Sequence, residues 1–118
     1  MTRPLAVGLI VAVTVLAPLV AQKQPEADYR VYGPGALPCR DWAEAQRTAE
    51  PTKFDAAYVY EVWLLGFVSG AGYAGLPMRA TDSKGIKSFI DQYCAGRPED
   101  NLSQAATALV RGLRVKAP

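Results

Sequence analysis

The stretch from Phe54 to Ala74, which reads FDAAYVYEVWLLGFVSGAGYA, constrains the fold of this 118-residue chain more than any other part of it. As one helix it would be roughly 30 Å long, at about 1.5 Å per residue. Apolar side chains occur almost all the way round such a helix, which is typical of burial in a core or in lipid. Asp55, Glu61 and three glycines argue against a membrane span, which needs about 20 mostly apolar residues. We therefore expect a central helix with other helices wrapped round it.

Small residues gather in the second half of this stretch, at Gly66, Ser69 and Gly70. A glycine in a helix interior costs about 1 kcal/mol relative to alanine. We expect close approach of a neighbouring backbone to compensate, so these three residues, with Trp63 and the upstream Trp42, are predicted to serve helix packing. The run GFVSG resembles the G-x-S-x-G nucleophile elbow only superficially, because it has one residue too many before the serine and no histidine partner.

The first 21 residues have the layout of a secretory signal peptide. Arg3 supplies the positive charge, residues 5–16 form the apolar region, and residues 17–21 offer a cleavage site. An uncleaved N-terminal anchor is the competing interpretation. Residues 22–36 are predicted to be a flexible lead-in that contains a turn signal, and residues 37–118 the folded domain. The expected location is periplasmic or secreted.

Export would place the two cysteines, Cys39 and Cys94, in an oxidising compartment, where they can form a disulfide. Two separate buried thiols are the alternative. Cleavage would remove Arg3, so that 13 basic side chains become 12 against 11 acidic ones, a net charge of +1. Nucleic acids and membrane surfaces are bound through basic patches or stripes. We therefore expect neither partner once the signal segment is removed.

Apolar periodicity predicts three further helices. They cover about residues 37–49, residues 83–95 with Asp82 as the N-cap, and residues 102–113. No segment alternates with period two, so no sheet is expected. The predicted fold class is all-α: a small four-helix domain around a central apolar helix, with one disulfide between the first and third helices.

The side chains that carry most enzyme chemistry are scarce in this chain. It has no histidine, and two distant cysteines are too few for the usual zinc site. We therefore predict no catalytic residue, no metal, no cofactor and no enzymatic activity. Glu61 is the one carboxylate within the apolar run. It is either a rim residue with its head in water or paired with an arginine, or a buried acid that senses pH.

The loop from Gly75 to Thr81 has the most functional interest on the expected surface. Leu76 and Met78, if exposed beside Arg79, would form a small apolar tip of the kind found at protein interfaces. These three residues are the predicted partner-binding site. The alternative is that both apolar side chains fold back as a lid over the helix ends.

Several short motifs occur together in a fixed order. They are CRDW at 39–42, WLLGFVSG at 63–70, DSKGI at 82–86, FIDQYC at 89–94, and NLSQAATALV at 101–110 after Pro98. With the exported N-terminus, this pattern resembles the Rap/Tai family of small exported helical proteins. The characterised members of that family are immunity proteins against amidase effectors of type VI secretion.

The resemblance implies a fold similar to that of the periplasmic acid chaperone HdeA, with Cys39 and Cys94 at the family's disulfide positions. It also implies a periplasmic protein, often a homodimer, that blocks a peptidoglycan-cleaving amidase by placing a loop over the catalytic cleft. No catalytic residue carries over. Two functions stand as hypotheses: an inhibitor of a cell-wall amidase, or an acid-stress holdase like HdeA. The modest acidic content, 11 Asp and Glu side chains, argues mildly against the second.

Overall fold

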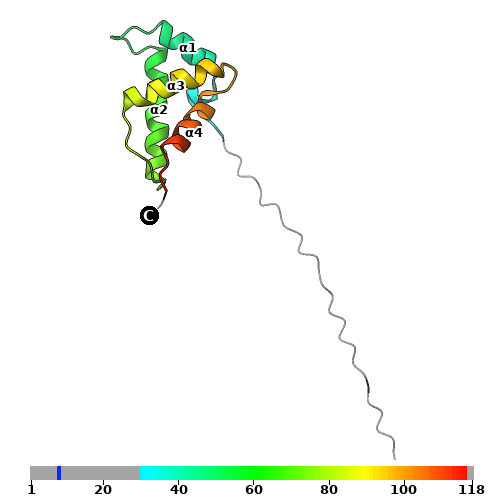
Figure 1. The fold of residues 1–118 in the computed structure, drawn as a ribbon. Coiled ribbons are helices and arrows are strands. Elements are labelled where there is room, and N and C mark those ends of the chain that lie inside the picture. Colours follow the sequence, from blue (N-terminus) through cyan, green and yellow to red (C-terminus); the bar gives the residue numbers. More distant parts are fainter. Residues whose placement is uncertain (1–7, 9–29, 117–118) are drawn as a thin grey trace, which may run out of the picture.

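A computed structural model of the chain describes residue 8 and residues 30–116. The predicted signal peptide (apart from Gly8) and residues 22–29 of the predicted lead-in lie outside this range. The described chain contains a short 3-10 helix, η1 (Gly33–Ala36), followed by α1 (Cys39–Arg47), α2 (Ala56–Tyr73), α3 (Ser83–Gly96) and α4 (Leu102–Leu113) (Figure 1). The all-α class, the four α-helices and the disulfide are confirmed.

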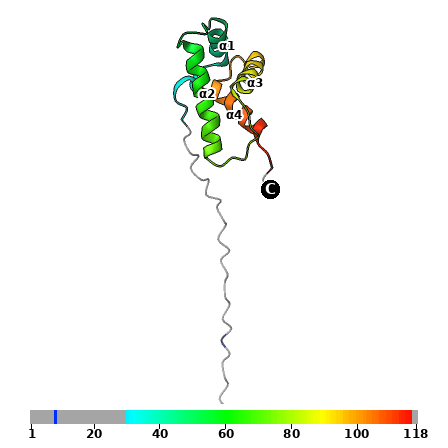
Figure 2. The same ribbon diagram turned by 90° about the vertical axis from the view of Figure 1, so that its left-hand side faces the viewer.

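The central helix α2 contacts η1 and every other described helix, while Tyr58, Val59, Val62 and Leu65 on it stay exposed. Its buried residues are Ala57, Tyr60 and Leu64, which recur at i, i+3 and i+7 and so form one stripe. Figure 2 shows α1, α3 and α4 on the same side of α2. The prediction of a central helix is confirmed, although the surrounding helices leave part of the circumference of α2 exposed. Partner helices of 9, 14 and 12 residues also pack on one another and cannot encircle an 18-residue helix.

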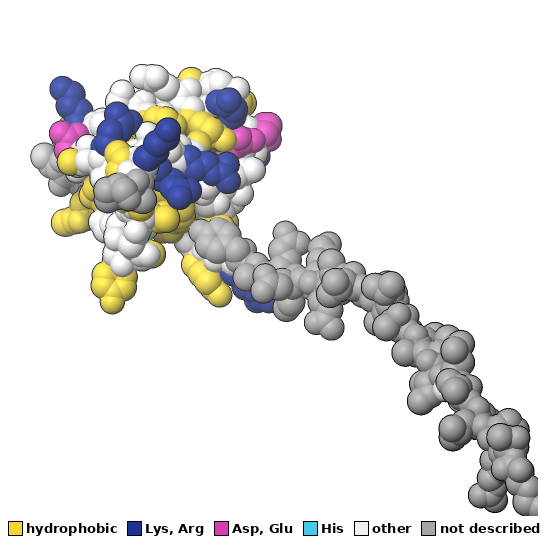
Figure 3. Space-filling model, turned by 60° about the horizontal axis from the view of Figure 1, so that its bottom comes forward, with side chains coloured by type: hydrophobic (Ala, Val, Ile, Leu, Met, Phe, Trp, Pro, Cys, Tyr) yellow, Lys and Arg dark blue, Asp and Glu magenta, His cyan; other side chains and the backbone are white. Residues whose placement is uncertain are grey.

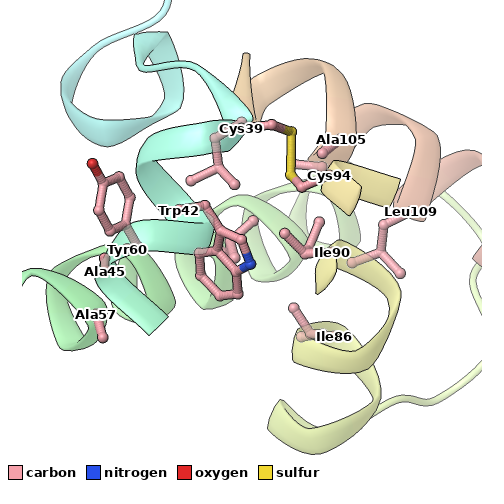
Figure 4. Packing of buried hydrophobic residues seen from close by; sticks show 13 residues of the cluster. Cys39, Trp42, Ala45, Ala57, Tyr60, Ile86, Ile90, Cys94, Ala105 and Leu109 are labelled. Carbon is pink, nitrogen blue, oxygen red and sulfur yellow. A yellow bond between two sulfur atoms is a disulfide. The ribbon is translucent and has the colours of Figure 1, made fainter. Parts of the chain in front are cut away.

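The core lies between the four helices and centres on Trp42 (Figure 4). Trp42 is fully buried, and its ring packs edge-on against Tyr60 with 6.2 Å between ring centroids. Its indole N–H donates a hydrogen bond to Asp91 Oδ1 at 2.9 Å, so the one polar atom of the side chain is satisfied. The packing role predicted for Trp42 is confirmed.

A disulfide joins Cys39, the first residue of α1, to Cys94 in the last turn of α3. Both cysteines are buried against the core, and 55 residues separate them in the sequence. The predicted pairing is therefore confirmed, and the alternative of two free thiols was wrong. A disulfide is consistent with an oxidising compartment.

The first turn of α1 is capped by another part of the chain. Its N-cap residue, Pro38, makes no side-chain cap, so the free N–H groups of the first turn need other acceptors. The Cys39 N–H donates to the carbonyl of Asp100 at 2.7 Å, and the Arg40 N–H donates to the carbonyl of Pro98 at 3.1 Å. The connection between α3 and α4 therefore fixes the start of α1 beside the disulfide.

The other helices begin at side-chain caps. Asp55 accepts a hydrogen bond from the Tyr58 N–H at the start of α2, and Asp82 caps α3 as predicted. Asn101 and Gln104 form a reciprocal capping box at the start of α4. Such caps satisfy N–H groups that the helix itself cannot, which fixes where each helix starts.

The segment before α1 belongs to the folded domain from residue 31 onward. The Trp63 indole donates a hydrogen bond to the carbonyl of Tyr32 at 2.9 Å, and the buried Gly35 lies directly against the Trp63 ring. The predicted flexible lead-in over residues 22–36 was therefore wrong for residues 31–36. Because Gly35 and Trp63 are distant in sequence, no local pattern reveals this contact. The packing role of Trp63 is confirmed, although its partner is η1 as well as the core.

We predict that Gly35→Ala destabilises the domain, because an added Cβ would overlap the Trp63 indole and the Val31 side chain. Overpacking of this kind costs about 1–3 kcal/mol. Urea denaturation measures the loss. Gly112→Ala is the matched control, since among the described residues nothing beyond the local helix backbone lies within 4 Å of a Cβ added there. Equal stability of the two variants would contradict the docking of η1 on Trp63.

Candidate protein-binding surface

The uncovered side of α2 carries large apolar side chains. We call Tyr58, Val59, Val62 and Leu65 the α2 outer face; their exposed fractions are 46%, 51%, 47% and 38%. Their spacing of i, i+1, i+4 and i+7 places them together, away from the buried stripe. Phe54, which precedes the helix and is almost fully exposed, packs edge-on against Tyr58 with 4.8 Å between ring centroids. The apolar surface therefore continues past the start of α2.

The α2 outer face contains no charged side chain, whereas a solvated helix face is normally polar. Contiguous exposed apolar side chains of this kind mark interaction sites on folded proteins. Glu61 lies at the edge of this face, half-buried, and accepts a hydrogen bond from Gln46 Nε2 at 3.3 Å. That position agrees with the rim interpretation of Glu61, with glutamine rather than arginine as its partner.

The small residues of α2 do not pack inside the chain. Gly66, Ser69 and Gly70 are exposed, and no described atom lies within 4 Å of a Cβ added at either glycine. The helix-packing role predicted for these three residues was wrong. They instead extend the α2 outer face toward the C-terminal end of the helix as a shallow strip.

Because this strip is open, we predict that Gly66→Ala and Gly70→Ala each stabilise the domain. Replacing glycine by alanine in a helix interior gains about 0.5–1 kcal/mol when nothing obstructs the methyl group. Thermal unfolding followed by circular dichroism measures the gain. Gly85→Ala is the control without a gain, because its Cβ would lie 2.8 Å from Thr81 Oγ1. Destabilisation by the first two variants would show that a neighbour occupies the space beside α2.

The segment of residues 76–79 is fixed to the end of α4. The Arg79 N–H donates to the carbonyl of Leu113 at 2.8 Å, and the Val115 N–H donates to the carbonyl of Pro77 at 3.0 Å. Leu76 and Met78 are half-buried, and only Arg79 is exposed. The partial burial of the two apolar side chains agrees with the lid interpretation rather than with an exposed apolar tip. Partner binding by Leu76, Met78 and Arg79 stays a prediction.

This segment closes one wall of a groove of about 320 Å³, which we call the α4 groove. The lining residues come from α2, the 76–79 segment and α4; they are Phe67, Ala71, Leu76, Thr107, Val110, Arg111 and Arg114. A second, more polar groove of about 550 Å³ shares Thr107 and Arg111 with it and continues along α4. The two grooves thus follow the same helix.

Tyr93 lines the polar groove and has a fixed protonation state near neutral pH. Its hydroxyl donates a hydrogen bond to Asp100 Oδ2 at 2.7 Å, which raises the pKa of Tyr93 above its ordinary value; burial adds to this. The Arg97 guanidinium lies over the same ring, 4.6 Å from its centroid. The phenol therefore acts as a neutral wall of the polar groove rather than as a titrating group.

The described residues hold no metal-binding cluster, since no group of three or more His, Cys, Asp or Glu side chains comes together among them. No helix within residues 30–116 combines the length and the hydropathy of a membrane span.

Comparisons with protein-family models, with curated proteins and with solved structures each find no match to this chain. The resemblance to the Rap/Tai family therefore remains a prediction from sequence motifs.

Proposed function

We propose that this chain is an exported, non-enzymatic protein-binding domain that inhibits a peptidoglycan amidase through the α2 outer face. The observation that carries the proposal is the exposure of Tyr58, Val59, Val62 and Leu65 side by side on a helix whose opposite side packs in the core. Burying such side chains against a partner gains about 25 cal/mol per Å² of apolar surface removed from water. A folded domain keeps such a face for binding, because exposure otherwise favours aggregation.

The amidase enters the proposal through the motif pattern, and two further features support it. The buried Cys39–Cys94 disulfide suits a protein that works outside the cytosol, where peptidoglycan is found. The small residues Gly66, Ser69 and Gly70 leave a shallow strip beside the apolar side chains, into which a partner's backbone or side chains could fit closely. The proposed mechanism is steric: the bound domain covers the cleft of the enzyme and takes no part in chemistry.

Co-expression with a periplasmically targeted cognate amidase tests the proposal. The wild-type chain is expected to prevent lysis, and Val62→Lys to abolish protection, because the partner would bury an unpaired ammonium group. A cost of several kcal/mol for that burial corresponds to a loss of affinity of at least about 100-fold. Gln92→Lys, at an exposed position of α3, adds the same charge elsewhere and is expected to protect fully.

Two results would contradict the proposal separately. Lysis with the wild-type chain would exclude that amidase as the partner. Full protection by Val62→Lys, with the variant melting cooperatively like the wild type, would exclude the α2 outer face as the docking surface. Sedimentation velocity measures in the same samples whether the homodimer that the resemblance implies forms, and dissociation of a dimer in Val62→Lys would assign its interface to the same face.

The second candidate function is an acid-stress holdase, for which the helix cap made by Asp55 is an acid-sensitive contact. This carboxylate caps α2 directly before the outer face and accepts hydrogen bonds from the Glu50 and Tyr58 amides at 2.8 and 3.1 Å. Those bonds lower the pKa of Asp55 below its ordinary value of 3.8. Suppression of client aggregation at pH 2–3 would support this function; its absence there would exclude it.

The same cap gives a pH prediction. A lowered pKa in the folded state means that the cap stabilises the domain above the ordinary carboxyl pKa, and that this stabilisation is lost as pH falls through the lowered value. The amide signals of Glu50 and Tyr58 in ¹⁵N-resolved NMR are expected to titrate together with a midpoint below 3.8. A midpoint at or above the ordinary value would contradict the cap.

A further inference from the structure

A second surface lies at the end of the molecule where α2 and α4 finish, and its chemistry differs from that of the α2 outer face. The α4 groove has an apolar floor of Phe67, Ala71, Leu76 and Val110. Figure 3 views the molecule toward this end and shows lysine and arginine side chains gathered over apolar ones. The combination of an apolar floor and a cationic rim restricts which ligand the groove would accept.

Four cations belong to this end of the molecule: Arg79 from the 76–79 segment, and Arg111, Arg114 and Lys116 from the end of α4 and the residues after it. All four are exposed. In the part of the chain that the structure describes, none of them forms an ion pair; the ion pairs found there use other cations. Their charges therefore remain available to a ligand.

The dipole of α4 accounts for only part of this charge. The C-terminus of a helix carries about half a negative elementary charge, which favours basic residues in its last turn. Arg79 also donates a hydrogen bond to the carbonyl of Gly112 at 2.8 Å, which satisfies one free acceptor at the helix end. Four cations around half a charge leave a large positive excess, and residues 101–116 contain no carboxylate to offset it.

We propose that the α4 groove binds an acidic peptide segment of a protein partner. An apolar side chain of the segment packs against Phe67, Leu76 and Val110, and its flanking carboxylates meet Arg111 and Arg114. Guanidinium groups bind carboxylates through paired, charge-assisted hydrogen bonds. The two grooves, which share Thr107 and Arg111, together follow α4 for about 20 Å at 1.5 Å per residue, a length that matches roughly six residues of an extended peptide. None of these residues belongs to the α2 outer face, so the proposal does not rest on the proposed function.

Fluorescence anisotropy with a labelled peptide EDLFED tests the proposal directly. The chain is expected to bind EDLFED at least tenfold more tightly than QNLFQN, which lacks the charges, and than EDGGED, which lacks the apolar anchor. Added salt is expected to weaken binding, since the charged contacts are exposed. The charge-reversed double variant Arg111→Glu/Arg114→Glu is expected to lose EDLFED and to bind KRLFKR instead. Lys84→Glu reverses one charge outside the groove lining, as each half of the double variant does within it, and is expected to keep the wild-type preference.

Several outcomes would overturn the proposal. They are an absence of binding to EDLFED, equal affinity for EDGGED, and unchanged affinity in the double variant. Tighter binding of phosphatidylglycerol vesicles through the same two arginines would assign the surface to an anionic membrane instead. If the double variant does not melt cooperatively, Arg111→Gln and Arg114→Gln replace it, each with an expected loss of at least fivefold; unchanged affinity in both would again reject the site.

Discussion

Replacing both cysteines, as Cys39→Ala/Cys94→Ala, is expected to lower the free energy of unfolding by about 4 kcal/mol. The disulfide closes a loop of 55 residues, and cutting it returns the conformational entropy of that loop to the unfolded chain. Domains of this size have a total stability of only about 5–15 kcal/mol. The variant is therefore expected to be partly unfolded at 37 °C.

Urea denaturation of the oxidised wild type, the reduced wild type and the double variant measures this loss. Reduction and substitution are expected to agree, because each removes the same covalent constraint. The alanine side chains leave little empty space, since Cys39 and Cys94 are small. A difference below about 1 kcal/mol between oxidised and reduced protein would show that the disulfide does not hold α1 on α3 in the way described.

Trp42→Ala is expected to cost about 3–5 kcal/mol, the usual effect of removing a large buried aromatic side chain. Trp42 is exposed by only 1% and lies between the helices of the core, where Tyr60 and Ile90 line its site. Its removal would also leave Asp91 Oδ1 without the indole donor. Chemical denaturation followed by circular dichroism gives the loss.

Trp42→Phe separates the two contributions. It keeps an aromatic ring but removes the N–H, and Asp91 retains its ion pair with Lys87 at 2.7 Å. We expect a loss of about 1–3 kcal/mol for this variant, because it removes a hydrogen bond to a charged group together with some volume. If Trp42→Ala cost no more than Trp42→Phe, the packing role assigned to Trp42 would be contradicted.

The helices that pack one clear apolar stripe were predictable from sequence. α3 runs from Ser83 to Gly96, within one residue of the predicted range, because its apolar residues recur at helical spacing and Asp82 supplies a cap. α2 was also predicted as a helix, but the sequence did not predict which side of it the other helices cover. A helix that is apolar all round carries no information on which side its neighbours cover, since this depends on the number and the lengths of the other helices.

The candidate sites depend on contacts between segments that are distant in the sequence. Residues 76–79 meet the end of α4 through backbone hydrogen bonds, which do not depend on the type of side chain. The α4 groove therefore has no local pattern in the sequence that would predict it. Basic residues at the end of α4 are explained by its dipole when the sequence is read alone. The excess of positive charge becomes apparent only when the fold places Arg79 beside these residues. Gly66 and Gly70 are similarly ambiguous, because small residues suit both close packing and an open strip.

The central claim is that the domain leaves the α2 outer face uncovered. Methyl NMR of the monomeric chain in the presence of a soluble paramagnetic agent tests it most directly. Strong relaxation enhancement is expected for the methyl groups of Val59 and Val62, and little for those of Leu64 and Ile90. Protection of the Val62 methyl groups equal to that of Leu64 would mean that other parts of the chain wrap α2, and would contradict the account.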